Sequence, residues 1–100
     1  MIKHIVMWKI KENVEGRSQL ENGKLVKDRM EALKNEIKEI INIEVGLNIV
    51  EAEQAYDIAL YSEFASLEDL NIYQKHPAHL EVVKFAGQFL ESRVVIDYKV

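Results

Sequence analysis

The feature that most constrains this chain is the order in which two hydrophobic periodicities alternate along it. Apolar side chains in residues 2–10 (IKHIVMWKI) recur at every second position, which predicts a β-strand with one apolar face. From Ser18 the apolar residues recur at helical spacing to about residue 41, and Ser18 followed by Glu21 resembles a capping box. Because glycine weakens a helix by about 1 kcal/mol relative to alanine, Gly23 favours an effective helix start near Lys24.

Two further strands are expected in the middle of the chain. Residues 41–51 (INIEVGLNIVE) and 55–64 (AYDIALYSEF) both alternate, and the short connection EAEQ between them predicts a hairpin. Ser66 is a good N-cap and is followed by acidic residues, so a short helix is expected to begin there.

The C-terminal third is expected to hold a helix and a strand. The short helix ends near Lys75, because Pro77 disfavours helical conformation at the residue before it. Pro77 is itself a favoured first helical residue, and the next helix is predicted to run from there to about Phe89. Residues 93–100 form the last predicted strand, with one face made by Val94, Ile96, Tyr98 and Val100.

The resulting order, βαββαβ, predicts an α+β fold, the ferredoxin-like sandwich with a four-stranded antiparallel sheet. Its helices can cover only one face of the sheet. The other face is nevertheless expected to carry apolar side chains, namely Ile5, Met7, Ala59, Tyr61 and Val95. Since an apolar second face on a small domain calls for a partner, we expect a homodimer joined through this face.

Length, charge and cysteine content limit the classes of function. One hundred residues are the size of one domain, expected to span residues 1–100. The net charge of −4, with no basic run, gives no electrostatic reason to expect nucleic acid. The chain has no cysteine, which excludes disulfides and thiol chemistry and fits a cytoplasmic protein. Neither a signal peptide nor a membrane span is expected, because lysines interrupt the N-terminal apolar stretch.

The segment YQKHPAHLEVVKF, residues 73–85, concentrates the residues with chemical potential. His79 falls in the first turn of the helix that Pro77 starts, and a histidine with an ordinary pKa near ~6.5 suits proton transfer. Tyr73 precedes the helix break, so its hydroxyl is able to approach the same space and stabilise an oxyanion. A purely structural interpretation of both stays open. His76 is expected to be extended and to flank the helix N-terminus, which is a structural role.

Three stretches of the chain carry a family resemblance. The opening IKHIVMWKIK, the block IYQKHPAHLEVVKF and the ending VVIDYKV resemble the stress-responsive dimeric α/β-barrel proteins over nearly the whole chain. The resemblance implies a ferredoxin-like protomer that pairs into a dimeric α/β barrel. The best-defined activity in that family is a plant polyketide cyclase, the olivetolic acid cyclase. It implies Tyr73 and His79 as a catalytic pair here, with His4 lining the pocket.

The chain departs from the cyclase at Asp57, where that enzyme carries a histidine. Asp57 is expected either to line the pocket and orient an imidazole or to be a polar residue of an edge strand. His4 and Trp8 share the apolar face of the first strand, so each is a candidate for the core or for the pocket lining.

Two cofactor hypotheses compete with a simple pocket. A metal would need His76 and His79 to converge, with His4 or Asp57 as a third ligand and no cysteine to help. A haem would use His79 as its axial ligand, but the strand asparagine and helical tryptophan of related haem-degrading oxygenases are missing. Neither a metal nor a cofactor is therefore expected.

The sequence thus predicts a small homodimeric protein with a small, mostly apolar ligand pocket and no assigned activity. Its ligand is expected to be apolar or aromatic. The alternative is a cofactor-independent cyclase or lyase, with His79 as the base and Tyr73 as the oxyanion donor.

Overall fold

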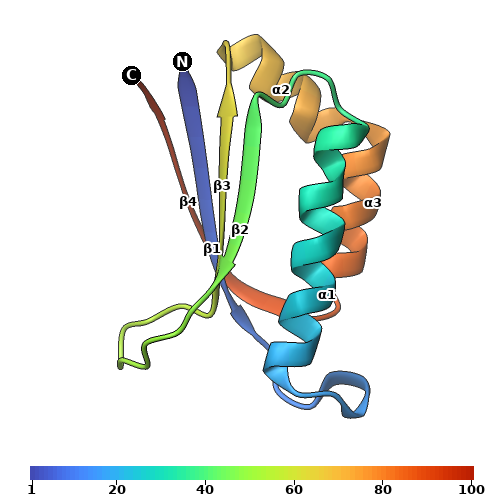
Figure 1. Ribbon diagram of the computed structural model, residues 1–100, viewed down its shortest axis with the longest axis vertical. Coiled ribbons are helices and arrows are strands. Elements are labelled where there is room, and N and C mark those ends of the chain that lie inside the picture. Colours follow the sequence, from blue (N-terminus) through green and yellow to red (C-terminus); the bar gives the residue numbers. More distant parts are fainter.

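The computed structural model describes residues 1–100 and arranges them in two layers, one sheet and one layer of helices (Figure 1). The strands are β1 (Ile2–Ile10), β2 (Asn42–Leu47), β3 (Ile58–Phe64) and β4 (Leu90–Lys99). They form a four-stranded antiparallel sheet in the order β2-β3-β1-β4. The predicted ferredoxin-like α+β fold is confirmed.

Helices α1 (Gln19–Glu31), α2 (Leu67–Lys75) and α3 (Pro77–Ala86) all lie on one side of the sheet (Figure 1). Two short 3-10 turns, η1 (Val14–Gly16) and η2 (Ala32–Asn35), flank α1. The apolar faces of helices and sheet enclose a core of 18 buried hydrophobic residues, contributed by every helix and strand. None of the helices is long and apolar enough to cross a membrane.

Helix α1 begins earlier than the sequence suggested. The hydroxyl of Ser18 accepts the N–H of Glu21 at 3.1 Å, and the Glu21 carboxylate accepts the N–H of Ser18 at the same distance. This capping box places Gly23 inside the helix. A Cβ atom there would lie 2.9 Å from Leu47 Cδ2 and 3.0 Å from Ile10 Cδ1. The glycine therefore lets α1 approach the sheet closely, and the expected start at Lys24 is wrong.

Other boundaries also differ from expectation, and β4 begins at Leu90, before the expected start at residue 93. Helix α1 does not continue to residue 41, because the chain tightens into η2 and the Leu33 carbonyl accepts both following N–H groups, from Glu36 and Ile37. The link between β2 and β3 is a longer loop, residues 48–57, and Ile49 in it is 93% exposed. Helix α3 ends at Ala86 instead of Phe89.

The side chains of strand β4 lie on the opposite faces of the sheet from those predicted. Val94 pairs with Met7 and Ile96 pairs with Ile5, so both lie on the uncovered face, whereas Val95 pairs with Val6 on the helix side. The cause is a bulge: the register with β1 shifts between Met7 and Lys9, and Ser92 adopts φ 57°. Because strand side chains alternate, one extra residue moves all that follow to the other face.

The uncovered face of the sheet is consequently more apolar than expected. It carries Ile5, Met7, Ala59 and Tyr61 together with the β4 side chains Val94, Ile96 and Tyr98, and we call this set the open face. No helix lies on this side of the sheet in Figure 1. The two edge strands of the sheet also differ in how their backbone groups are satisfied. Val45 in β2 donates its N–H to Glu31, and its carbonyl accepts from Lys27, both on α1. No further strand pairs with the outer edge of β4.

Candidate functional site

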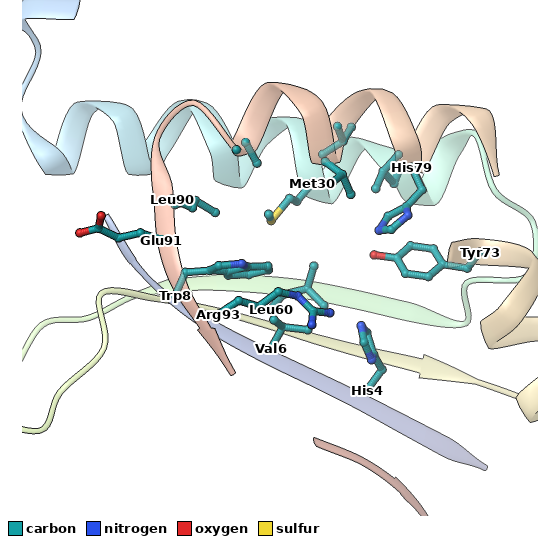
Figure 2. A pocket seen from close by; sticks show the side chains of 15 residues that line it. His4, Val6, Trp8, Met30, Leu60, Tyr73, His79, Leu90, Glu91 and Arg93 are labelled. Carbon is teal, nitrogen blue, oxygen red and sulfur yellow. The ribbon is translucent and has the colours of Figure 1, made fainter. Parts of the chain in front are cut away.

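A cavity of about 280 Å³ lies between the helix side of the sheet and helices α1 and α3 (Figure 2). Ten of its fifteen lining residues are hydrophobic, and its walls include Val6, Trp8, Met30, Leu33, Leu60 and Val82. Three of its polar groups, His4, Tyr73 and His79, lie close together on one side (Figure 2). A mostly apolar cavity with a few convergent polar groups is the usual form of a small-molecule site.

Tyr73 is held in place by burial on all sides except at its hydroxyl. It lies in the last turns of α2, is 1% exposed, and packs its ring 5.0 Å from that of Phe64. The hydroxyl has no hydrogen-bond partner in the protein, and the structure contains no fully buried side-chain polar atom that lacks one, so this oxygen opens onto the cavity. Burial raises the pKa of Tyr73 to about 12, although the charge of Arg93 acts against it.

His79 stands next to Tyr73, with 4.3 Å between ring centroids. It lies in the first turn of α3, and its Nδ1–H donates to the Gln74 carbonyl at 3.0 Å. Burial lowers the pKa of His79, and this outweighs the hydrogen bond to Gln74, which raises it. At neutral pH the imidazole is therefore uncharged, and with the proton on Nδ1 the lone pair of Nε2 is free to accept another.

His4 is a buried histidine of β1 with a carboxylate partner. Its Nδ1 is hydrogen-bonded to Asp97 Oδ1 on β4, and its ring centroid lies 6.2 Å from that of Tyr73. Asp97 was not identified in the sequence, because it is 93 residues away from its partner. The pairing of the first and last strands, which places His4 opposite Asp97, is the signal that would have identified it.

The structure corrects the expected placement of Asp57. This residue does not line the cavity: its carboxylate accepts the N–H of Ile10 at 2.7 Å, and its own N–H donates to the Trp8 carbonyl at 2.9 Å. It precedes β3 and ties the loop 48–57 to the end of β1. The carboxylate that orients an imidazole is Asp97 instead.

The two histidines of the HPAH segment do different things. Pro77 is the first residue of α3, and His76 is its N-cap, with Nδ1 accepting the Ala78 N–H at 3.0 Å. His79 points into the cavity (Figure 2). The structure contains no group of three or more His, Asp or Glu side chains placed to hold a metal ion.

Two charged residues of β4, Glu91 and Arg93, also line the cavity and were missed in the sequence. Both are exposed to solvent, and Arg93 makes no side-chain hydrogen bond or ion pair. They flank Ser92, the residue of the bulge, so their direction depends on an irregularity that strand periodicity does not predict.

Fold and cavity together define a class: ferredoxin-like α+β domains that hold a few polar groups in an apolar cavity between helices and sheet. Within that class, the model of the Stress responsive A/B Barrel Domain matches residues 2–100. The chain therefore belongs to the stress-responsive A/B barrel family, as the resemblance predicted.

Known proteins similar to this chain come from distant organisms. A stress-response A/B barrel domain-containing protein of Arabidopsis thaliana is 25% identical over 107 residues, and the match covers 98% of this chain. The chain spans 46% of the length of that relative.

Among solved structures, a dimeric protein of unknown function with a ferredoxin-like fold, from Bacteroides fragilis, is 38% identical, with a TM-score of 0.81. The match covers 99% of this chain and 95% of that one. A hydroxynitrile lyase from Passiflora edulis has a TM-score of 0.83 over 99% of this chain and 92% of its own, and at 22% identity this likeness is evidence for the fold alone. The specific likeness to a plant polyketide cyclase stays a prediction.

Proposed function

We propose that this chain forms a homodimer in which each cavity binds one small apolar or aromatic molecule that carries a polar group. The observation that supports this most is the Tyr73 hydroxyl, which sits in a buried side chain and yet has no partner in the protein. The ring is buried but the oxygen opens onto the cavity, so the hydroxyl is free to form a hydrogen bond with a ligand there. His79 offers an acceptor beside it.

The dimer proposal rests on the open face. Apolar side chains of β1, β3 and β4 gather there with no helix over them, and the Bacteroides fragilis protein, 38% identical, is described as dimeric. Isologous pairing of the same face on two copies would bury this surface and give closed two-fold symmetry.

Native mass spectrometry of the purified protein is the direct test. We expect a dimer mass, with up to one small-molecule adduct per chain that denaturation releases. If no adduct appears, titration of the empty protein with naphthamide, followed by the fluorescence of Trp8 in the cavity wall, gives the second readout. A dimer that neither carries nor takes up a small molecule would contradict the binding proposal, and a monomer would contradict the dimer.

A second candidate is a cofactor-independent enzyme of the cyclase or lyase type. It is favoured by one observation: the Nδ1–H of His79 is committed to Gln74, which leaves a neutral Nε2 in the cavity beside a protonated phenol. In this proposal Nε2 takes a proton from a carbon next to a substrate carbonyl. The Tyr73 hydroxyl donates a hydrogen bond to the oxygen on which the negative charge develops.

Acetophenone in deuterated water tests this chemistry without a known substrate. We expect the wild-type protein to speed deuterium uptake at the methyl group, and His79→Ala to reduce the protein-catalysed rate by about 100-fold or more while fold and dimer persist. Equal rates in both proteins would contradict the enzyme proposal. A loss of stability as large as the loss of rate would identify His79 as structural.

Two other expectations from the sequence stay predictions. One is that residues 1–100 act as a single domain, which is tested by cooperative unfolding with coincident transitions from two probes. The other is a cytoplasmic location, which is tested by cell fractionation.

A further inference from the structure

The bulge at Ser92 sets the position of one cationic side chain relative to the cavity. Met7 pairs with Val94 and Lys9 pairs with Glu91, so Ser92 and Arg93 together face the single residue Trp8. Ser92 adopts φ 57°, a left-handed conformation that is unfavourable for a residue with a Cβ. The irregularity places Arg93 on the helix side of the sheet with Val95, where it lines the cavity.

Arg93 brings a guanidinium to the cavity without an anion to pair with it. The two other charged groups near it on β4 do not pair with it: Asp97 is bonded to His4, and Glu91, which also lines the cavity, makes no ion pair with Arg93. The charge of Arg93 nevertheless acts inside the cavity: burial raises the pKa of Tyr73 and lowers that of His79, and Arg93 opposes the first shift and adds to the second.

The apolar walls of the cavity and the unpaired guanidinium suit two different parts of one ligand, a hydrocarbon body and an anionic group. Arginine presents a planar fork of N–H donors that matches a carboxylate at two points, which an ammonium group does not. The walls that face it, including Trp8, Leu60 and Met30, suit a flat hydrocarbon body. A volume of about 280 Å³ lies just below the roughly 300–1,000 Å³ that is common for ligand sites, which favours a small ligand.

We propose that the ligand of this cavity is a small aromatic or apolar carboxylate, whose carboxylate group pairs with Arg93 while its body lies against Trp8 and the other apolar walls. This inference rests on the proposed binding function and specifies the ligand class for it.

Calorimetric titration with two ligands of the same shape separates the effect of ligand charge on affinity from the effect of ligand shape. Naphthoate and naphthamide share the ring body, but only the first is ionised at neutral pH. For the wild-type protein we expect naphthoate to bind about tenfold more tightly than naphthamide, and the preference to shrink as salt is added. Arg93→Gln should abolish the preference without weakening naphthamide, and Arg93→Lys should keep part of it.

Lys84→Gln is the matched control, because it removes the same charge from an exposed position on α3 that does not line the cavity. It should leave the tenfold preference intact. Equal affinities for naphthoate and naphthamide in the wild-type protein would overturn the carboxylate inference and leave the binding function standing. If neither ligand binds, the binding function fails, and the inference fails with it.

Discussion

At the scale of single residues, Tyr73 combines near-complete burial with a hydroxyl that does nothing for the fold. If this residue served only in packing, phenylalanine would do equally well, because the ring alone makes the contacts with Phe64 and His79. What the oxygen adds is a donor inside an apolar cavity, and burial keeps it protonated at any physiological pH by raising the pKa to about 12.

Replacing Tyr73 by Phe should therefore leave the free energy of unfolding within about 0.5 kcal/mol of the wild type, because no protein hydrogen bond is lost. The same change should weaken naphthamide binding by roughly fivefold, the effect of about one hydrogen bond. Urea unfolding and calorimetry measure the two quantities. Tyr61→Phe is the control, because Tyr61 donates to Glu63 on the open face, outside the cavity. A Tyr73→Phe protein that is destabilised but binds normally would show that the hydroxyl is structural.

His79 predicts a pH dependence of stability. Its pKa is lowered in the folded protein, so the unfolded chain takes up the proton first as the pH falls below the ordinary value near ~6.5. The contribution of His79 is thus fully present above that pH and is lost on acidification toward the folded pKa. We expect the urea midpoint of the wild type to drop more between about pH 7.5 and pH 5.5 than that of His79→Gln. Parallel pH profiles would show that His79 is not responsible.

How much of the site could be read from the sequence depends on how local each residue's surroundings are. Tyr73 and His79 lie on either side of a proline that fixes a helix start and are only six residues apart, so their proximity is predictable from local sequence. Asp97 and Arg93 could not be found in the same way. One depends on pairing across 93 residues, and the other on a bulge.

At the scale of elements, the order and type of helices and strands follow from periodicity, but the direction that β4 faces does not. Its alternating apolar residues fit either face, and Ser92 is not one of the residues that usually mark a left-handed position. The early end of α1 was missed for a similar reason, because Ile37 and Ile40 are buried without being helical.

Ser92→Gly should raise the free energy of unfolding by up to about 1 kcal/mol, because glycine adopts φ 57° without a Cβ penalty. Ser92→Val should lower it by about 1–2 kcal/mol, since a branched side chain tolerates that conformation poorly. Both are measured by denaturant unfolding. If both substitutions destabilised the protein equally, the Ser92 side chain itself, and not its backbone conformation, would be what matters there.

At the scale of the whole molecule, the open face makes assembly testable with one exposed residue. Ile96 is 58% exposed on this face, so Ile96→Glu should cost the isolated fold little, yet place a charge within the proposed interface. Sedimentation velocity should show a shift from dimer to monomer. Ile49→Glu, a change at the 93% exposed position in the loop 48–57, should leave the dimer intact. Dissociation by the second change alone would move the interface to that loop.

The side chains of strand β4 alternate between the two proposed surfaces, the ligand cavity and the open face. Arg93 and Asp97 turn toward the cavity and its histidine, whereas Val94, Ile96 and Tyr98 turn toward the open face, and the strand between them is one peptide layer thick. If a ligand shifts β4, ligand occupancy and self-association become thermodynamically linked. A ligand that tightens the dimer by some factor must bind the dimer more tightly than the monomer by a matching factor. Protein concentration would thereby become a variable in every affinity measured for this cavity.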